Sequence, residues 1–237
     1  MPTAKKQILY PYAQWYFALA VLVTWVGFSM SYFARLRSTD VYHHIHGATV
    51  GLWIVLLIVQ PILYQRGKLA LHRKLGWFAT IVLVPLIVLC GFKMLQMMMR
   101  SQDAYPPGAT YMLSFFDVFG MLIFVLFFGL GIYHAKNVHN HARYMVCTVL
   151  TILPPAITRV LFFIPWFDSF SKTVNGSFVT IYVVLLILLW DDKRSGKIRK
   201  PYIVAFILFA LLQTAMNFAP GWAWWHGAMD WYAGLGK

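Results

Sequence analysis

The sequence contains no glutamate, and its seven acidic residues are outnumbered by 20 lysines and arginines. Charged residues make up only 11% of the 237 positions, whereas soluble domains carry about a quarter. This shortage of charge, together with 60% hydrophobic residues, excludes an ordinary soluble domain and predicts an integral membrane protein. Only two cysteines occur, Cys90 and Cys147, and both lie in apolar runs, which excludes a disulfide scaffold.

Several function classes are excluded by what is missing. The formal net charge of +13 would suggest a nucleic-acid partner in a soluble protein, but the basic residues here lie in short segments between apolar runs, so we expect no nucleic acid. A P-loop, a nucleophile elbow and an HExxH motif are absent from the sequence. The last apolar run has no lysine for a retinal Schiff base.

Long apolar runs dominate what is present. A spanning helix needs about 20 mainly apolar residues, and the sequence predicts about seven such spans. The expected spans are 14–35, 46–64, 75–98, 111–133, 144–166, 176–190 and 201–219. We therefore expect an all-α polytopic bundle that forms one transmembrane domain over residues 1–237. The aromatic-rich end of the chain, GWAWWHGAMDWYAG, is too broken to span and is expected to lie along the outer interface.

The basic residues predict the orientation of this bundle. Most of them fall in alternate connections, and these connections should face the cytoplasm. This set is Lys5, Lys6, Arg66, Lys68, Arg73, Lys74, Lys136, Arg143, Lys193, Arg194, Lys197, Arg199 and Lys200. The opposite connections and the C-terminus carry Arg35, Arg37, Arg100, Lys172 and Lys237. The N-terminus is therefore expected in the cytoplasm and the C-terminus outside, in a bacterial inner membrane.

This topology divides the eight histidines into two groups. The outer group is His43, His44, His46 and His226, and the inner group is His72, His134, His139 and His141. Within the inner group, His72 and His141 begin two predicted spans at one depth, where two imidazoles could hold a haem iron. Arg73 and Arg143 would then neutralise its propionates, with His134 and His139 as further candidates. Zinc or copper would also suit these nitrogens, and ordinary interfacial contacts with lipid headgroups are the alternative.

The outer histidines predict a second candidate site. His43 and His46 are three residues apart and can share a helix face, so they could bind zinc or copper if a third ligand lay nearby. Asp40, His44 or His226 could supply it. The alternative is that these histidines rest where the membrane meets water.

Polar residues inside the predicted spans indicate a third candidate site. Asp117 and Arg159 fall at similar depth and are expected to form a buried pair, either around a polar pocket or as a structural ion pair. Its expected neighbours are Lys93, Gln60, Gln96, Gln213 and Asn217. Pro154 and Pro155 should kink the helix that carries Arg159. His46, Trp53 and Gln60 are spaced by seven and should lie on one stripe of their helix.

Two stretches carry a resemblance to a known group of proteins. "HGATVGLWIVLLIVQPILYQRGKLALHRKLGW" and "HARYMVCTVLTILPPAITRVLF" resemble an uncharacterised family of bacterial polytopic membrane proteins, over residues 45–166. The matching positions are His46, His72 with Arg73, His141 with Arg143, and Thr158 with Arg159. This four-helix core is also distantly similar to transmembrane b-type cytochromes.

The resemblance implies haem b and electron transfer across the membrane. The sequence departs from the two-haem pattern because no evident second outer ligand is present, which leaves one inner haem or none. We therefore expect a haem- or quinone-linked electron-transfer subunit that contacts membrane lipids and a larger membrane complex or redox partner. The alternatives are a zinc- or copper-dependent membrane enzyme, and a non-catalytic accessory subunit or small-solute transporter.

Overall fold

The computed structural model describes residues 12–236, and all regular structure in that range is helical. Lys5, Lys6 and Lys237, which enter the orientation argument, lie outside the described residues. The α-helices in that range are α1 (Ala13–Phe28), α2 (Val41–Gln65), α3 (Leu69–Phe78), α4 (Val84–Arg100), α5 (Ala109–Tyr133), α6 (Val138–Ile152), α7 (Pro154–Leu161), α8 (Phe170–Arg194), α9 (Lys200–Phe218) and α10 (Ala223–Gly234). A π-helical turn, Ala79–Leu83, joins α3 to α4, so residues Leu69–Arg100 form one long rod.

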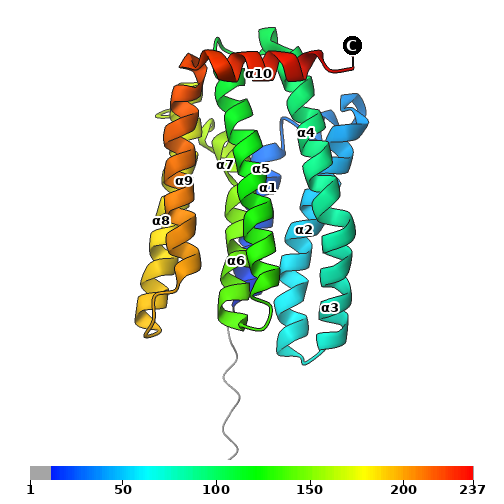
Figure 1. The fold of residues 1–237 in the computed structure, drawn as a ribbon, viewed down its shortest axis with the longest axis vertical. Coiled ribbons are helices and arrows are strands. Elements are labelled where there is room, and N and C mark those ends of the chain that lie inside the picture. The colour runs from blue at the N-terminus through cyan, green and yellow to red at the C-terminus, as the bar shows by residue number, and fades with distance from the viewer. Residues whose placement is uncertain (1–11, 237) are drawn as a thin grey trace, which may run out of the picture.

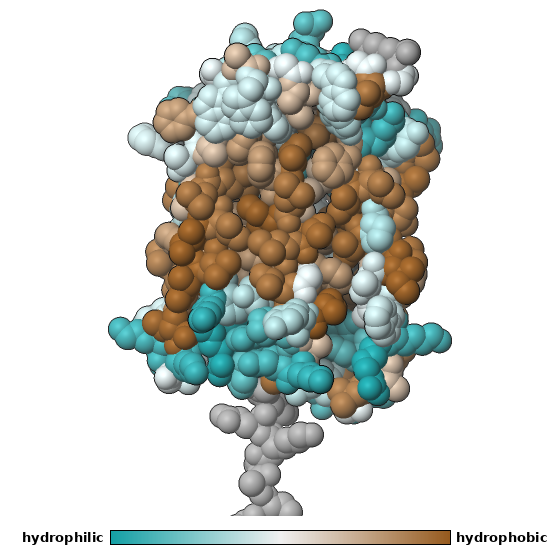
Figure 2. Space-filling view, viewed as in Figure 1, coloured by the Kyte–Doolittle hydropathy of each residue, from teal (hydrophilic) through white to brown (hydrophobic). Residues whose placement is uncertain are grey.

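The helices identify an integral membrane protein. Five of them are long and apolar enough to cross a membrane, and a sixth span results if α6 and α7 are counted together. The expected kink is confirmed, because α6 and α7 meet at a bend of 45° at the break before Pro154. The hydropathy surface agrees, with an apolar band between two polar ends (Figure 2).

The bounds of several predicted spans differ from the structure, and the first and the sixth differ in instructive ways. The first was expected over 14–35, but α1 ends at Phe28 and has 16 residues, about 24 Å of helix, which is short for the apolar core of a bilayer. The sixth was expected over 176–190, whereas α8 runs from Phe170 to Arg194. Its first turns are polar and are capped by the side chain of Ser169, which hydropathy alone does not count as helix.

The connections between helices gather at two opposite ends of the bundle (Figure 1). We call one the basic end; it holds the connections 66–68, 134–137 and 195–199. We call the other the α10 end, because α10 lies across it (Figure 1). The aromatic-rich C-terminal segment therefore forms a short helix that covers the bundle and does not cross it, as the sequence predicts.

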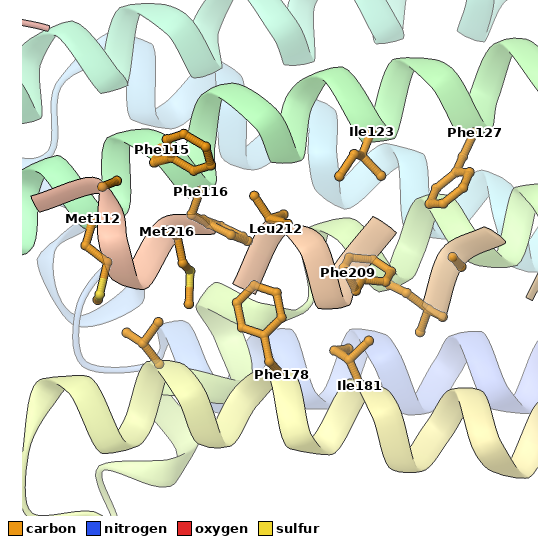
Figure 3. Packing of buried hydrophobic residues seen from close by; sticks show 14 of the residues in the cluster. Met112, Phe115, Phe116, Ile123, Phe127, Phe178, Ile181, Phe209, Leu212 and Met216 are labelled. Atoms are coloured by element: carbon orange, nitrogen blue, oxygen red, sulfur yellow. The ribbon is translucent and has the colours of Figure 1, made fainter. Parts of the chain in front are cut away.

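Two clusters of buried side chains hold the helices together. The larger joins α5, α8 and α9, with Phe127, Phe178 and Phe209 fully buried between them (Figure 3). The smaller joins α1, α2, α4 and α5 around Trp53, which is 2% exposed and packs against Phe124 and Phe128. The buried position of Trp53 confirms that its stripe of α2 faces inward.

The C-terminal helix is fastened to α4 by hydrogen bonds. Gln96 Nε2 donates to the carbonyl oxygens of Tyr232 and Leu235, at 3.1 and 2.9 Å. Arg100 Nε donates to the carbonyl of Ala233 at 2.8 Å. Burial raises the pKa of Tyr232, so its hydroxyl keeps its proton and donates to the carbonyl of Phe92 at 2.8 Å. The bonds from Gln96 and Arg100 end on carbonyls at the C-terminal end of α10 and just beyond it, where a helix leaves carbonyls without partners inside the helix.

Candidate functional site

The structure brings His72 and His141 together near the basic end. His72 lies in the first turn of α3, and His141 lies in the first turn of α6. Their ring centres are 6.2 Å apart, and the ring planes are inclined by 61°. Both side chains are half-buried between the helices, so this is a pair of imidazoles at one depth, as the sequence predicts.

Each ring is anchored through Nδ1 to a backbone carbonyl. His141 Nδ1 lies 2.7 Å from the carbonyl oxygen of Gly131 on α5, and His72 Nδ1 lies 3.3 Å from that of Gln60 on α2. A carbonyl can only accept, so each Nδ1 carries the proton and each Nε2 keeps its lone pair. Carbonyl anchoring of this kind orients histidine ligands in metal sites.

Gln60 adds a further acceptor beside the pair. Its Nε2 donates to the backbone carbonyl of His72 at 3.1 Å, which joins α2 to α3. Its Oε1 is buried and has no hydrogen-bond partner. Gln60 Oε1 is therefore an acceptor without a donor close to His72. A cation or a hydrogen-bond donor would satisfy it.

This donor set fits an iron or copper ion held between two imidazoles. The ring-centre separation of 6.2 Å brings the two imidazoles within reach of one ion. Neutral imidazole suits iron, copper and zinc.

The other inner candidates take different positions. Arg73 is exposed at the start of α3, close in sequence to His72. Arg143 is 4% exposed and forms an ion pair with Asp192 of α8, so its charge is already compensated. His134 stacks on Tyr144, with ring centres 5.6 Å apart, and the carbonyl of His139 accepts from Arg143.

The Arg143–Asp192 pair was not foreseen from the sequence. Arg143 Nε lies 2.8 Å from Oδ1 of Asp192, whose Oδ2 accepts from the backbone N–H of Arg199 at 3.1 Å. Arg143 also donates to the carbonyl of His139 at 2.9 Å and lies over the ring of Tyr202. The pair therefore joins α6, α8 and α9. An aspartate at the end of an apolar run was the available signal, but nothing in the sequence named its partner.

The outer histidines do not form one cluster. The ring of His43 contacts the carboxylate of Asp40, and His44 Nδ1 lies 2.8 Å from the hydroxyl of Tyr32. His226 of α10 stacks on Tyr111, and its Nε2 lies at hydrogen-bond distance from the carbonyl of Pro220. These contacts are different from those of His43 and His44. Across residues 12–236, no group of three or more histidine, cysteine, aspartate or glutamate side chains could hold a metal ion.

The expected polar pocket is only partly assembled. Asp117 and Arg159 act on each other electrostatically, but within the described residues they are not an ion pair, because no oxygen of Asp117 lies within 4.0 Å of the guanidinium. Arg159 donates to Ser31 Oγ and to the carbonyl of Pro155, and it lies over the ring of Phe28 at 4.5 Å. The short helix α7 and the end of α1 therefore position this cation.

The expected neighbours of that pocket lie elsewhere. Lys93 Nζ donates to Gln96 Oε1 at 2.8 Å beneath α10, and Gln60 is near the basic end with His72. Gln213 and Asn217 bond to Asn175, with distances of 2.9 Å, in a seam between α8 and α9. The helical period gives the face of each residue, but it does not give the neighbouring helix.

Comparisons with known proteins identify no relative. No family model matches the chain, no curated protein matches it, and no solved structure matches it. The resemblance to a bacterial membrane-protein family and to b-type cytochromes therefore stays a prediction. The chain is a helical integral membrane protein with five or six candidate spans.

Proposed function

We propose that this protein is an electron-transfer subunit of a membrane, and that His72 and His141 would hold one b-type haem. The observation that carries this proposal is the pair of imidazoles 6.2 Å apart, each anchored through Nδ1 to a carbonyl. That anchoring leaves both Nε2 atoms free to bind a metal. When bound, a haem would supply one-electron transfer.

The residues of the chain have distinct tasks in this proposal. The carbonyls of Gly131 and Gln60 hold the rings of His141 and His72 in their orientations. The Gln60 side chain binds the backbone of His72, and this bond keeps the start of α3 against α2. Arg73, exposed at the basic end, is the arginine best placed for propionates. Arg143 has a different task, because Asp192 already binds it. A quinone or a larger membrane complex would serve as the redox partner.

The orientation in the membrane is part of the same proposal. We place the basic end in the cytoplasm and the α10 end outside a bacterial inner membrane, with α1 and the bent α6–α7 pair completing seven spans. The concentration of lysine and arginine at the basic end supports this orientation, because basic residues favour the cytoplasmic side. The hairpin connections 66–68, 134–137 and 195–199 all meet there (Figure 1).

The test is an absorption spectrum of the purified protein, first oxidised and then reduced with dithionite, with metal analysis of the same sample. We expect a Soret band that shifts on reduction, and its loss in His72→Ala and in His141→Ala. His226→Ala is the matched control, because this histidine lies at the α10 end against Tyr111. A colourless protein, or a Soret band unchanged in both ligand variants, would overturn the proposal.

A further inference from the structure

His46 lies in the α10-end half of the bundle and is not used by the proposed haem site. It sits in the second turn of α2, and its Nδ1 is buried without a hydrogen-bond partner. A buried ring nitrogen without a partner costs free energy, and a metal ion bound to its lone pair would remove that cost.

A thioether borders the same space. A Cβ atom built on Gly91 of α4 would lie 2.6 Å from Met121 Sδ of α5 and 3.7 Å from His46 Cε1. Glycine at position 91 therefore lets Met121 Sδ approach α4 closely, with the imidazole of His46 beside the same position. Any larger residue there would displace the methionine.

A carboxylate lies one turn away on the same face of α5. Asp117 precedes Met121 by four residues, and residues four apart are neighbours on a helix surface. Within the described residues no hydrogen bond or ion pair is formed by the Asp117 carboxylate. Arg159 acts on this carboxylate only from beyond ion-pair distance, and a charged side chain inside a membrane protein is costly, so a bound cation would lower that cost.

We propose that His46 Nδ1 and Met121 Sδ are ligands of one copper ion, with Asp117 supplying the compensating charge. A thioether is a soft ligand that selects copper in its reduced form, and imidazole suits the same metal. Zinc in structural sites is bound by thiolate, imidazole or carboxylate, so a thioether favours copper over zinc. The site joins α2 to α5, and it needs nothing from His72 or His141.

The test is a titration of the detergent-purified protein with copper(I) against a coloured copper(I) chelator. It is done in a His72→Ala/His141→Ala background, so that the haem site cannot contribute. We expect one copper ion per chain, and loss of that binding in His46→Phe and in Met121→Leu. The same titration with zinc should show no binding that depends on Met121.

Two glycine-to-alanine variants separate an effect on the copper site from general damage to the fold. Gly91→Ala places its methyl group against Met121 Sδ, and we expect copper affinity to fall by roughly ten- to a hundredfold, as for other supports of a metal ligand. Gly129→Ala on α5 meets nothing within 4 Å and should bind as the parent does. Copper binding that is absent in the parent, or equal in the parent, Met121→Leu and Gly91→Ala, would overturn this proposal and leave the haem proposal untouched.

Discussion

Gly27 of α1 lies directly against the backbone of Ala156 on α7. A Cβ atom added at Gly27 would come within 2.4 Å of the carbonyl oxygen of Ala156, closer than any real side-chain contact. Glycine at this position therefore allows two helix backbones to touch, as small residues often do in membrane proteins. The contact fixes the short helix that carries Arg159.

Gly27→Val should push α1 and α7 apart, because the clash involves backbone and cannot be relieved by rotating a side chain. We expect a loss of about 1–3 kcal/mol, the usual cost of overpacking, seen as a lower midpoint of thermal unfolding in detergent. Gly129→Ala is the control, since its added methyl group meets nothing within 4 Å. Equal stability of both variants would contradict the close contact.

Asp192→Ala should strongly destabilise the protein. It leaves Arg143, which is 4% exposed, without its carboxylate, and an unpaired buried charge costs about 3–5 kcal/mol. The measurement is thermal unfolding in detergent. The control is Lys172→Ala, which breaks an exposed pair with Asp168 and should cost no more than about 1 kcal/mol. Similar losses in the two variants would show that Asp192 is not buried as described.

Asp40→Ala should weaken the start of α2. The carboxylate accepts from the backbone N–H groups of Tyr42 and His43, at 2.9 and 3.2 Å, and the loss of such a cap costs about 1 kcal/mol. Asp40→Asn keeps an acceptor oxygen for these groups but loses the charge, so its loss of stability at neutral pH should be smaller than that of Asp40→Ala.

The same residue predicts a pH dependence. Partial burial alone would raise the pKa of Asp40, but the hydrogen bonds from His43 and Tyr42 hold it below its ordinary value of 3.8. A carboxylate with a depressed pKa stabilises the folded state above 3.8, and this contribution is lost as the pH falls through the folded pKa. The parent should therefore lose stability in acid relative to Asp40→Asn. Parallel unfolding curves at all pH values would refute this.

Release of α10 should be possible without unfolding the bundle. Gln96→Leu combined with Arg100→Ala removes the side chains that bind the carbonyls of Tyr232, Ala233 and Leu235. We expect faster hydrogen exchange over Ala223–Gly234 and unchanged exchange in α5 and α9. Gln102→Ala, which removes one long contact to Asp230, is the control and should leave exchange nearly as in the parent. Equal exchange in all three proteins would mean that packing alone holds α10.

Local patterns in the sequence predicted much of the fold. The seven-residue spacing placed Trp53 on the inner face of α2, and Pro154 with Pro155 predicted the bend between α6 and α7. The meeting of His72 and His141 followed from two histidines at the starts of helices that share one end of the bundle. These features depend on helical period, helix breakers and alternating direction, which are all local.

Contacts between distant segments were harder to predict. Asp117 and Arg159 share a depth, but α7 turns away after the proline break and Arg159 binds Ser31 and Pro155 instead. The partner of Arg143 is 49 residues away at the end of α8. Gly91 gives no signal of its own in the sequence, because Met121 and His46, which lie beside it, come from two other helices. Depth and face do not determine which helices are neighbours.

The break at Pro154 weakens the joint between α6 and α7. Pro154 and Pro155 donate no backbone hydrogen bond, so the ladder crosses the break at Leu153, whose N–H donates to Val149 and whose carbonyl accepts from Ala156 and Ile157. α7 also has contacts of its own, with Gly27 of α1 and, through Leu161, with Gly176 of α8. A change in the tilt of α6 at the basic end therefore reaches Arg159 through few backbone bonds, and we expect the histidine pair and the Arg159 end of the bundle to tolerate substitutions largely independently.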